Sequence, residues 1–545
     1  MDLNSRDRKQ LLELSALNNE YQNGNYLRVS QKLKDIEHNF QNFYLFWYLF
    51  ALNCVKLGHY DRAKKFFSKA VDLEPDSANL VRDIAIFYKN NNDLVEAAKY
   101  ALRYVELKPS SSDAYCTLGL VHLESSELIE AEQCFLDALK LNPEDENIQN
   151  NFAKLYMEKG DFNSAIRVLE RVLKTSKDNI EAKINLSLAY RSVNHLNKSL
   201  SIIGSVTATE WNVLDNRSKE QFKFNRSLAF LASGNCDKGW EDYLDRFKAP
   251  KFTSKFRNYE IPRLECLSKA FGNKLLIWPE QGIGDQLTFL ALINEFQKVT
   301  ASDMTLLCDP RMKTLLSRSF ENVHILTDPK LEINCQQWDY HLPLGDIAPL
   351  MKFSKEKTQF IKPYLKVDNR LFRNLKKDLS KKRIRVGLAW ESVIKNYKRN
   401  LNHTRLSDWA PLIENEDYIV YNLQYDFDDD DLTDCEQKLL FKINRPAFDL
   451  KNDFESLSAL MKTLDYVICP TTAIMAHAAA CGIPTLSYST IVSDRALGNV
   501  DHNSFSIPWF WHNKVYLYTP STKNNMIQNI LECVGENSAD RNKKY

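Results

Sequence analysis

Small and apolar positions recur every 34 residues along roughly the first 245 residues of the chain. Prolines that each close a tetrapeptide with leucine in second place keep this spacing, at Pro75, Pro109 and Pro143. Alanines upstream of them keep it too, at Ala63, Ala97, Ala131 and Ala165. Such a period is typical of a helix–turn–helix unit that stacks on its neighbours to bury its apolar face. We expect an all-α superhelix with a concave face, interrupted by an insertion near residues 205–218.

The pattern changes at Lys274, where short apolar runs begin to alternate with helix-like segments. The runs predict strands at 275–278, 304–309, 323–328 and 340–344, and then at 385–390, 418–425, 465–470 and 481–488. Strands that alternate with helices form parallel sheets covered by helices. We therefore expect three domains: repeats at 1–245, a first α/β lobe at 246–380 and a second at 381–545. Open sheets of this type bind ligands at the carboxyl ends of their strands, which places a site between the lobes.

Composition excludes several classes of partner. The 72 Lys and Arg residues nearly cancel the 71 Asp and Glu residues, so net charge favours neither a nucleic acid nor an anionic membrane. The polar first ten residues and the lack of a long apolar run predict neither a signal peptide nor a membrane span. Eleven cysteines without a paired spacing indicate reduced thiols. We expect a cytoplasmic protein.

The first candidate site is the segment 279–286, with the sequence PEQGIGDQ, which leads from a predicted strand into a helix. Gly282 and Gly284 let a ligand approach the backbone, and a helix N-terminus favours anions. A leucine replaces the third glycine of a dinucleotide fingerprint, and the GK[ST] of a Walker loop is missing. Asp285 has two interpretations, as the N-cap of the helix or as a catalytic carboxylate.

The second candidate site is the segment 469–477, with the sequence CPTTAIMAH, again at a strand-to-helix junction. Thr471 and Thr472 stand where the first helical amides have no partner, so hydroxyls and amides together could hold a diphosphate. A threonine cap without a ligand is the alternative. His477 fits a packed helix residue as well as it fits a ligand contact.

The repeats and the motifs of the two lobes resemble those of known protein families. The repeats look like tetratricopeptide repeats. The lobes, with GIGDQLTF, VGLAW, NLQY and TTAIMAHAAACGIPT, resemble the heptosyltransferase-related GT-B glycosyltransferases fused to such repeats in bacteria. The architecture is also similar to O-GlcNAc transferase. The resemblance implies a pair of Rossmann-like GT-B lobes that move a sugar from a nucleotide-sugar to a protein hydroxyl, without a metal or a cofactor.

The resemblance also implies roles for individual residues. It makes Asp285 the base toward the acceptor hydroxyl, and Thr471 and Thr472 a clamp for the donor diphosphate. The remaining candidate donor-binding residues are Gly282, Gly284, Lys395, Lys398, Arg399 and His477. The chain departs from its relatives where Thr472-Ala473 replaces Asp-Thr or Asp-Asn, and where KNYKRNLNHTR replaces a segment with Arg-Ser.

One column of the repeats carries asparagine in the last three units, at Asn151, Asn185 and Asn225. In this repeat type the position faces the concave groove, and the column resembles the asparagine ladder of O-GlcNAc transferase. An amide both donates and accepts hydrogen bonds, so it can hold an extended peptide without reading its sequence. Ordinary surface asparagine is the alternative, since Leu49 in the same column is apolar.

Other features suggest simpler interpretations, and three functions stay open. The acidic run of Asp426 and 428–431 mimics a metal site, but a solvated loop fits it better. Trp509 and Trp511 fit packing better than sugar stacking.

We expect a metal-independent glycosyltransferase acting on a protein. The alternatives are a non-catalytic scaffold with degenerate lobes and a transferase acting on a glycan or lipopolysaccharide. Homodimerisation through the repeats stays open.

Overall fold

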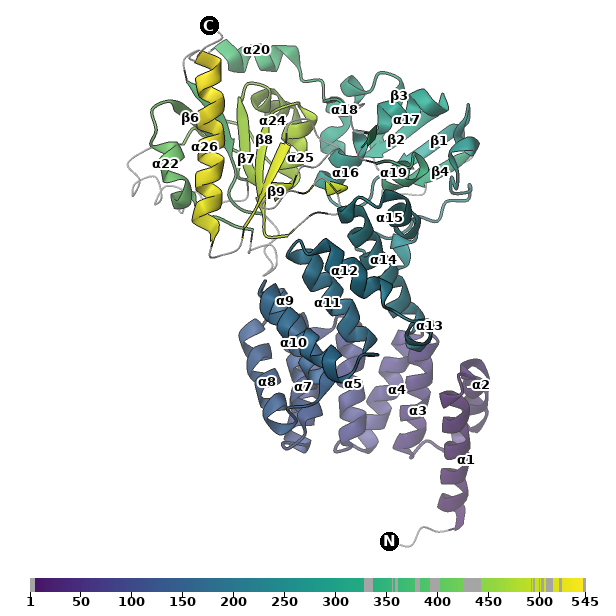
Figure 1. Ribbon diagram of the computed structural model, residues 1–545. Helices are drawn as coiled ribbons and strands as arrows, with labels where there is room; N and C mark the ends of the chain where they lie inside the picture. Colours follow the sequence, from purple (N-terminus) through teal and green to yellow (C-terminus); the bar gives the residue numbers. More distant parts are fainter. Residues whose placement is uncertain are drawn as a thin grey trace. The chain divides into compact units, whose positions relative to one another are not determined.

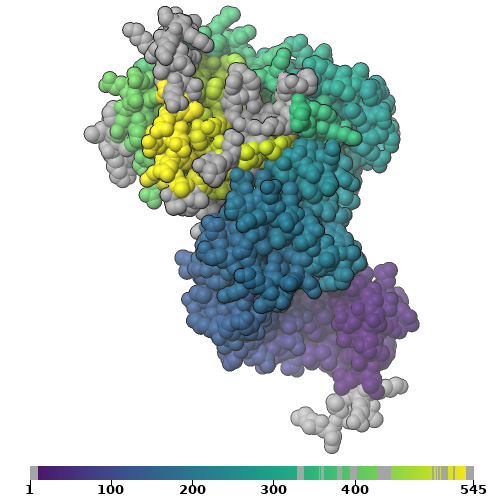
Figure 2. Space-filling model, viewed as in Figure 1, coloured from purple at the N-terminus to yellow at the C-terminus, as the bar shows by residue number. Residues whose placement is uncertain are grey.

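The computed structural model forms two compact units, Met1–Lys159 and Gly160–Tyr545. It describes residues 5–327, 337–354, 356–357, 361–377, 383–392, 402–425, 443–491, 493, 496–498, 500, 504–505, 513–518 and 522–542. Figure 1 shows the helical repeats in purple to dark teal and the two sheets in teal to yellow, and Figure 2 shows the same face with all atoms drawn.

The first unit is a run of antiparallel helix pairs. Its helices are α1 (Ser5–Gln22), α2 (Tyr26–Ile36), α3 (Tyr44–Lys56), α4 (Tyr60–Leu73), α5 (Ala78–Asn90), α6 (Leu94–Leu107), α7 (Ser112–Glu124), α8 (Leu128–Leu141) and α9 (Glu146–Glu158). The small-residue column explains their close packing, because a Cβ added at Gly119 of α7 would lie only 2.9 Å from the ring of Phe135 in α8. The turn glycine Gly58 has a positive φ of 76°, a conformation that favours glycine.

The second unit begins with the remaining repeats. Their helices are α10 (Phe162–Thr175), α11 (Ile180–Ser192), α12 (Leu196–Gly204), α13 (Ala208–Val213), α14 (Asn216–Ser233) and α15 (Cys236–Tyr243). The short α13 occupies the predicted insertion. The last repeat joins the first lobe directly, since the Trp240 Nε1 donates a hydrogen bond to the Phe353 carbonyl oxygen at 2.6 Å.

The first sheet has four parallel strands in the order β3-β2-β1-β4. They are β1 (Lys274–Trp278), β2 (Asp303–Cys308), β3 (Val323–Thr327) and β4 (Tyr340–Pro343). Residues 275–278 of β1 are fully buried, as expected of a central strand covered on both faces. The covering helices include α16 (Ile283–Leu290), α17 (Ile293–Thr300), α18 (Lys313–Ser319) and α19 (Ile347–Leu350).

The second sheet has six strands in the order β6-β5-β7-β8-β10-β9. They are β5 (Ile384–Leu388), β6 (Tyr418–Asn422), β7 (Tyr466–Pro470), β8 (Thr485–Ser489), β9 (Ser504–Phe505) and β10 (Asn513–Leu517). Among the described strand pairs of this sheet, β9–β10 is antiparallel and the others are parallel. The helices of this lobe include α20 (Asn369–Lys377), α22 (Ala410–Ile413), α24 (Phe454–Met461), α25 (Ala473–Ala480) and α26 (Lys523–Asn542).

Alternate residues of β7 pack into the two hydrophobic cores on opposite faces of the sheet. Val467 and Cys469 join the core that contains α24 and α25, whereas Ile468 joins the core that contains α26. This alternation follows from the two-residue period of a strand. Helices on both faces of a largely parallel sheet confirm the predicted fold class, a repeat array followed by two Rossmann-like lobes.

All eight strands predicted from the apolar runs are present, but β9 and β10 were not predicted. The two-residue β9 exists because it pairs with β10, a long-range contact that leaves no local periodicity. No helix in the described ranges is long and apolar enough to cross a membrane.

Candidate functional site

The first candidate segment forms the expected strand–turn–helix junction. β1 ends at Trp278, and Gln281 adopts a positive φ of 61° before α16 begins. The backbone N–H of Gln281 donates to the Ser254 Oγ at 2.7 Å, which holds this turn. The N-cap of α16 is Gly282, and Asp285 lies in the first helical turn. The cap interpretation of Asp285 is therefore wrong. Its carboxylate folds back over the turn, with Oδ2 3.9 Å from where a Cβ on Gly282 would lie.

A buried ion network fixes the residue that precedes this turn. The Arg246 Nη2 contacts the Glu280 Oε2 at 2.6 Å, and its Nη1 contacts the Asp346 Oδ1 at 2.9 Å. All three side chains are fully buried. Arg263 adds a second contact to Asp346, at 2.8 Å. A Cβ at Gly345 would collide with the Glu280 Oε1, so this packing requires glycine.

The charges of this network shift the pKa values of its own members. Burial alone would lower the pKa of the Arg246 guanidinium, but the charges of Glu280 and Asp346 outweigh it and raise that pKa above its usual range. Burial raises the pKa of the Glu280 carboxyl, and Arg246 opposes this shift. Arg246 follows the last repeat helix, so the network ties the end of the repeats to the turn that carries Asp285.

The second candidate segment starts α25 with hydrogen-bond donors that have no acceptor among the described residues. Thr472 is the N-cap residue, yet its side chain makes no capping hydrogen bond. The hydroxyls of Thr471 and Thr472 form no hydrogen bond with any described residue. Within the same ranges, the backbone N–H groups of Ala473 and Ile474 find no acceptor. These donors lie at a helix N-terminus, the type of place that attracts anions.

The two segments, far apart in the sequence, meet in the fold. A Cβ added at Gly284 would lie 3.1 Å from the Cα of Ala473, so the starts of α16 and α25 touch. Figure 1 shows the two helices side by side. The linker residue Tyr364 joins them farther along, because its hydroxyl donates to the Leu287 carbonyl at 2.6 Å and its N–H donates to the Ala480 carbonyl at 3.1 Å. Asp285 and the two threonines are thereby brought to one region of the second unit.

His477 lies behind this region. Its side chain is 2% exposed, its Nε2 is 2.6 Å from the Ser458 Oγ, and its ring stacks on Phe454 with centroids 5.3 Å apart. Burial lowers the pKa of His477 to about 4, so it is neutral at physiological pH. These contacts favour the interpretation of His477 as a packed residue.

Several candidates lie outside the described residues: Lys395, Lys398, Arg399, Asp426, 428–431, Trp509 and Trp511. Among the described residues, no cluster of His, Cys, Asp and Glu could hold a metal ion.

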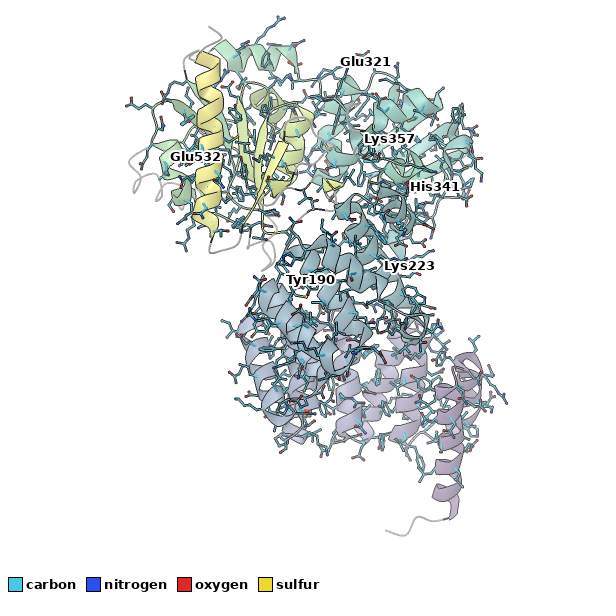
Figure 3. All side chains as sticks on the ribbon, in the orientation of Figure 1. Tyr190, Lys223, Glu321, His341, Lys357 and Glu532 are labelled. Carbon is cyan, nitrogen blue, oxygen red and sulfur yellow. The ribbon has the colours of Figure 1, made fainter. Side chains whose placement is uncertain are left out.

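The three asparagines predicted to bind an acceptor differ in their surroundings. Asn151 lies in α9 of the first unit, where its Nδ2 donates to the Cys116 Sγ at 3.3 Å. Asn185 and Asn225 lie in α11 and α14 of the second unit, the helices marked in Figure 3 by the labels Tyr190 and Lys223. The Asn225 Oδ1 accepts from the Gln221 Nε2 at 3.1 Å. The Asn185 side chain is 7% exposed, and its Nδ2 has no partner among the described residues.

Sequence reasoning missed Arg246, Arg263 and Asp346. Arg246 and Asp346 are 100 residues apart, and neither belongs to a motif. A cluster of buried charges has no local signature, so no signal in the sequence identifies it.

Comparison with known proteins confirms the repeats. Residues 44–77 and 122–189 match family models described as tetratricopeptide repeat. Protein FlbA of Caulobacter vibrioides is 26% identical over 307 residues, which cover 53% of this chain. The chain spans about half the length of that relative, 50%.

Two solved structures are similar to part of the chain. PilF of Pseudomonas aeruginosa is 16% identical with a TM-score of 0.32, over 36% of this chain and 90% of that one. A tetratricopeptide repeat protein from Parabacteroides merdae is 13% identical with a TM-score of 0.38, over 44% of this chain and 93% of that one.

Proposed function

We propose that this protein is a GT-B glycosyltransferase that moves a sugar from a nucleotide-sugar to a hydroxyl of a protein gathered by its repeats. In this proposal the repeats span 1–245, the acceptor-side lobe 246–380 and the donor-side lobe 381–545. The observation that carries the proposal is the contact between Gly284 and Ala473, which joins a carboxylate-bearing helix start to one whose hydroxyls and first amides have no partner among the described residues.

The donor diphosphate would bind at the start of α25. The hydroxyls of Thr471 and Thr472 and the first helical amides, of Ala473 and Ile474, are neutral donors that would bind phosphate oxygens. As the sugar–phosphate bond breaks, negative charge grows on the leaving diphosphate, and donors already in place stabilise it without reorganising. Gly282 and Gly284 keep the neighbouring backbone accessible. Lys395, Lys398 and Arg399 belong to the proposal as further phosphate ligands.

Asp285 would act as general base. It takes the proton of the acceptor hydroxyl as that oxygen forms a bond to the anomeric carbon, and the diphosphate leaves with the electron pair of the broken bond. A positioned base of this kind contributes a factor of about 10²–10⁴ in rate. No step of this reaction requires a metal or a cofactor.

The repeats would supply the protein acceptor. A buried amide nitrogen without a partner costs stability unless a ligand satisfies it, and the Asn185 Nδ2 is such a group among the described residues. This observation favours peptide binding at Asn185 over an unused helix surface, and Asn151 and Asn225 stay in the proposal through the resemblance of their column.

The test is the intact mass of candidate acceptor proteins after co-expression with the full chain. We expect a discrete mass increase with the wild type and none with Asp285→Asn, whose unfolding temperature should not change. Calorimetry with uridine, guanosine, adenosine and cytidine diphosphates separates the scaffold alternative. A scaffold would give no heat with any of them, and full transfer by Asp285→Asn would remove Asp285 as base.

A further inference from the structure

Four large aliphatic side chains are exposed on helices α6 and α8 of the first unit. Val95 and Ile129 are 80% and 79% exposed, and Leu102 and Leu136 are 51% and 40% exposed. Residues seven apart lie on one face of a helix, so each helix presents one aliphatic pair. We call these four residues the aliphatic patch.

The repeat period brings the two pairs of the patch to one surface. Val95 and Leu102 precede Ile129 and Leu136 by 34 residues, and α6 and α8 both pack against α7. In the units before and after, the same two positions hold the polar residues Asp61, Ser68, Asn163 and Glu170. The exposed aliphatic residues are therefore specific to α6 and α8 and are not a general property of the repeat. Neighbouring exposed apolar side chains of this kind mark an interaction surface.

The size of this surface limits the strength of an interaction. Each of the two helices has 14 residues. At 1.5 Å per residue and about 10 Å per helix, their common face is about 21 Å long and about 20 Å wide. A standard interface buries about 800 Å² on each partner, so this face suits an association that depends on concentration and not a permanent one.

Each aliphatic pair belongs to a row of four exposed residues spaced four, three and four apart, as in the seam of a coiled coil. The rows are Val95, Lys99, Leu102 and Glu106 on α6, and Ile129, Gln133, Leu136 and Lys140 on α8. Equal positions meet when two such helices pack in the same direction. Aliphatic residues then meet twice, the Lys99 ammonium donates to the Gln133 amide oxygen, and Glu106 meets Lys140. The two rows are therefore complementary at every position.

The charged members of the rows already form ion pairs within their own helices. These pairs are Glu96–Lys99 at 3.5 Å, Arg103–Glu106 at 2.9 Å and Asp137–Lys140 at 2.7 Å. In each pair the member that belongs to a row is well exposed. Each can therefore contact an opposite group on a second helix without losing its first partner.

We propose that the aliphatic patch is a homodimer interface, in which α6 of one chain packs along α8 of a second copy. A two-fold axis parallel to the helices forms this contact twice, in a closed and self-complementary interface. Packing of α6 on a second α6 in the same direction would instead bring Lys99 against Lys99 and Glu106 against Glu106. The patch lies on the second helices of its repeat units, whereas Asn151 lies on the first helix of its own unit, so the dimer and the predicted acceptor column use different helices.

The first test is analytical ultracentrifugation of the full chain. We expect a monomer–dimer equilibrium at micromolar concentrations. Val95→Glu and Ile129→Glu should each raise the dissociation constant at least about 100-fold, because each places a charge without a partner in both halves of the interface. A wild type that stays monomeric throughout the micromolar range would overturn the inference.

The matched control is Val213→Glu, because Val213 is 79% exposed like Val95 but lies in α13 of the second unit. It should dimerise as the wild type does. Thermal unfolding should show no difference among the glutamate variants, since all replace exposed side chains. A dissociation constant that Val95→Glu leaves unchanged, or that Val213→Glu raises equally, would contradict the interface.

The orientation of the helices is tested by charge reversal and by cross-linking. Glu106→Lys should raise the dissociation constant by up to about fivefold, as for an exposed ion pair, and adding Lys140→Glu should lower it again. Under oxidation, a chain with both Leu102→Cys and Leu136→Cys should form a covalent dimer, beyond any that the cysteines of the wild type form. A chain with Val95→Cys and Leu102→Cys should not, because those positions meet only when α6 packs on a second α6 in the opposite direction. The reverse result would overturn the arrangement.

The inference does not rest on the proposed function, and the two can fail separately. If the wild type is monomeric and Val95→Glu lowers the transfer measured by intact mass, the patch binds the acceptor and the inference fails while the transferase stands. If the chain dimerises as described but binds no nucleoside diphosphate, the proposed donor site fails and the interface stands.

Discussion

The starts of α16 and α25 have the same strand–turn–helix geometry but differ in their functional groups, a carboxylate in one and hydroxyls in the other. Each follows a buried parallel strand, each begins a helix of eight residues, and each leaves its first amides without a partner among the described residues. The α16 start carries Asp285 and is supported by the buried charges of Arg246, Glu280 and Asp346. The α25 start carries hydroxyls and is supported by apolar packing, with His477 neutral behind it.

The proposed transfer reaction needs a neutral site for an anion and a positioned carboxylate as base, and the two helix starts supply one each. Residues 466–489 contain no Asp, Glu, Lys or Arg, so an anion bound at α25 meets no fixed charge of either sign in that segment. A base needs a carboxylate whose position is held, and the ion network holds the turn that carries it. Keeping the carboxylate on one helix and the neutral donors on the other places them close together without building acidic residues into the proposed phosphate site.

The largest expected effect comes from breaking the ion network. Arg246→Met leaves Glu280 and Asp346 buried without their main partner, which should lower the free energy of unfolding by about 3–5 kcal/mol. Urea unfolding of the full chain measures it. The control is Arg226→Met, which removes a partly exposed pair with Asp242 and should cost at most about 1 kcal/mol. Equal losses in the two variants would show that the network is not a special support.

The α25 start is tested by its hydroxyls. The double variant Thr471→Ala, Thr472→Ala should weaken the binding of a nucleoside diphosphate by about 1.5–3 kcal/mol for each hydrogen bond lost to phosphate. Thr471→Ser, Thr472→Ser keeps the hydroxyls and should bind nearly as the wild type does. Calorimetry provides the measurement. If the alanine and serine variants bind alike, the hydroxyls do not contact the phosphates.

The contact between the two starts is tested by one substitution at two glycines. A Cβ at Gly284 would press against the Ala473 backbone, at 3.1 Å from its Cα, whereas a Cβ at Gly282 meets only the Asp285 Oδ2, at 3.9 Å. Gly284→Ser should cost about 1–3 kcal/mol of stability through overpacking. Gly282→Ser should cost little, since serine suits an N-cap position. Thermal unfolding measures both variants, and equal costs would mean that the helices do not touch as described.

The last expected effect is a pH dependence that each lobe contributes through a buried histidine. Burial lowers the pKa of His477 to about 4, and burial together with the charge of Arg263 lowers that of His341, labelled in Figure 3, to about 4. In the unfolded chain both titrate near about 6.5. The unfolded state therefore binds more protons between these values, and stability falls as the pH is lowered from 6.5 to 4.

Two single variants measure how much of this pH-dependent loss of stability each lobe contributes. His477→Gln and His341→Gln should each make the loss of stability between pH 6.5 and pH 4 shallower, measured as urea midpoints across that range. Asn322→Gln, on the surface of the first lobe, provides a control with an unchanged slope. A wild-type midpoint that rises on acidification would contradict the assignment of neutral buried histidines.

The sequence by itself determined the elements of this protein. The 34-residue period predicted the repeats because helix pairs of one length repeat the same contacts. The apolar runs predicted eight strands, and the glycine and threonine motifs identified both helix starts, because strand, turn and helix signals depend on neighbouring residues. Local sequence did not show whether Asp285 or Gly282 caps α16, since both residues suit a cap.

Only the tertiary structure decided how these elements meet. It paired β9 with β10, it joined Arg246 to a carboxylate 100 residues away, and it brought Gly284 against Ala473. Each of these contacts joins segments distant in the chain, and each depends on the space left by the surrounding core, which no local pattern records. The candidate site is therefore made of two predicted motifs and one packing contact that could not be predicted.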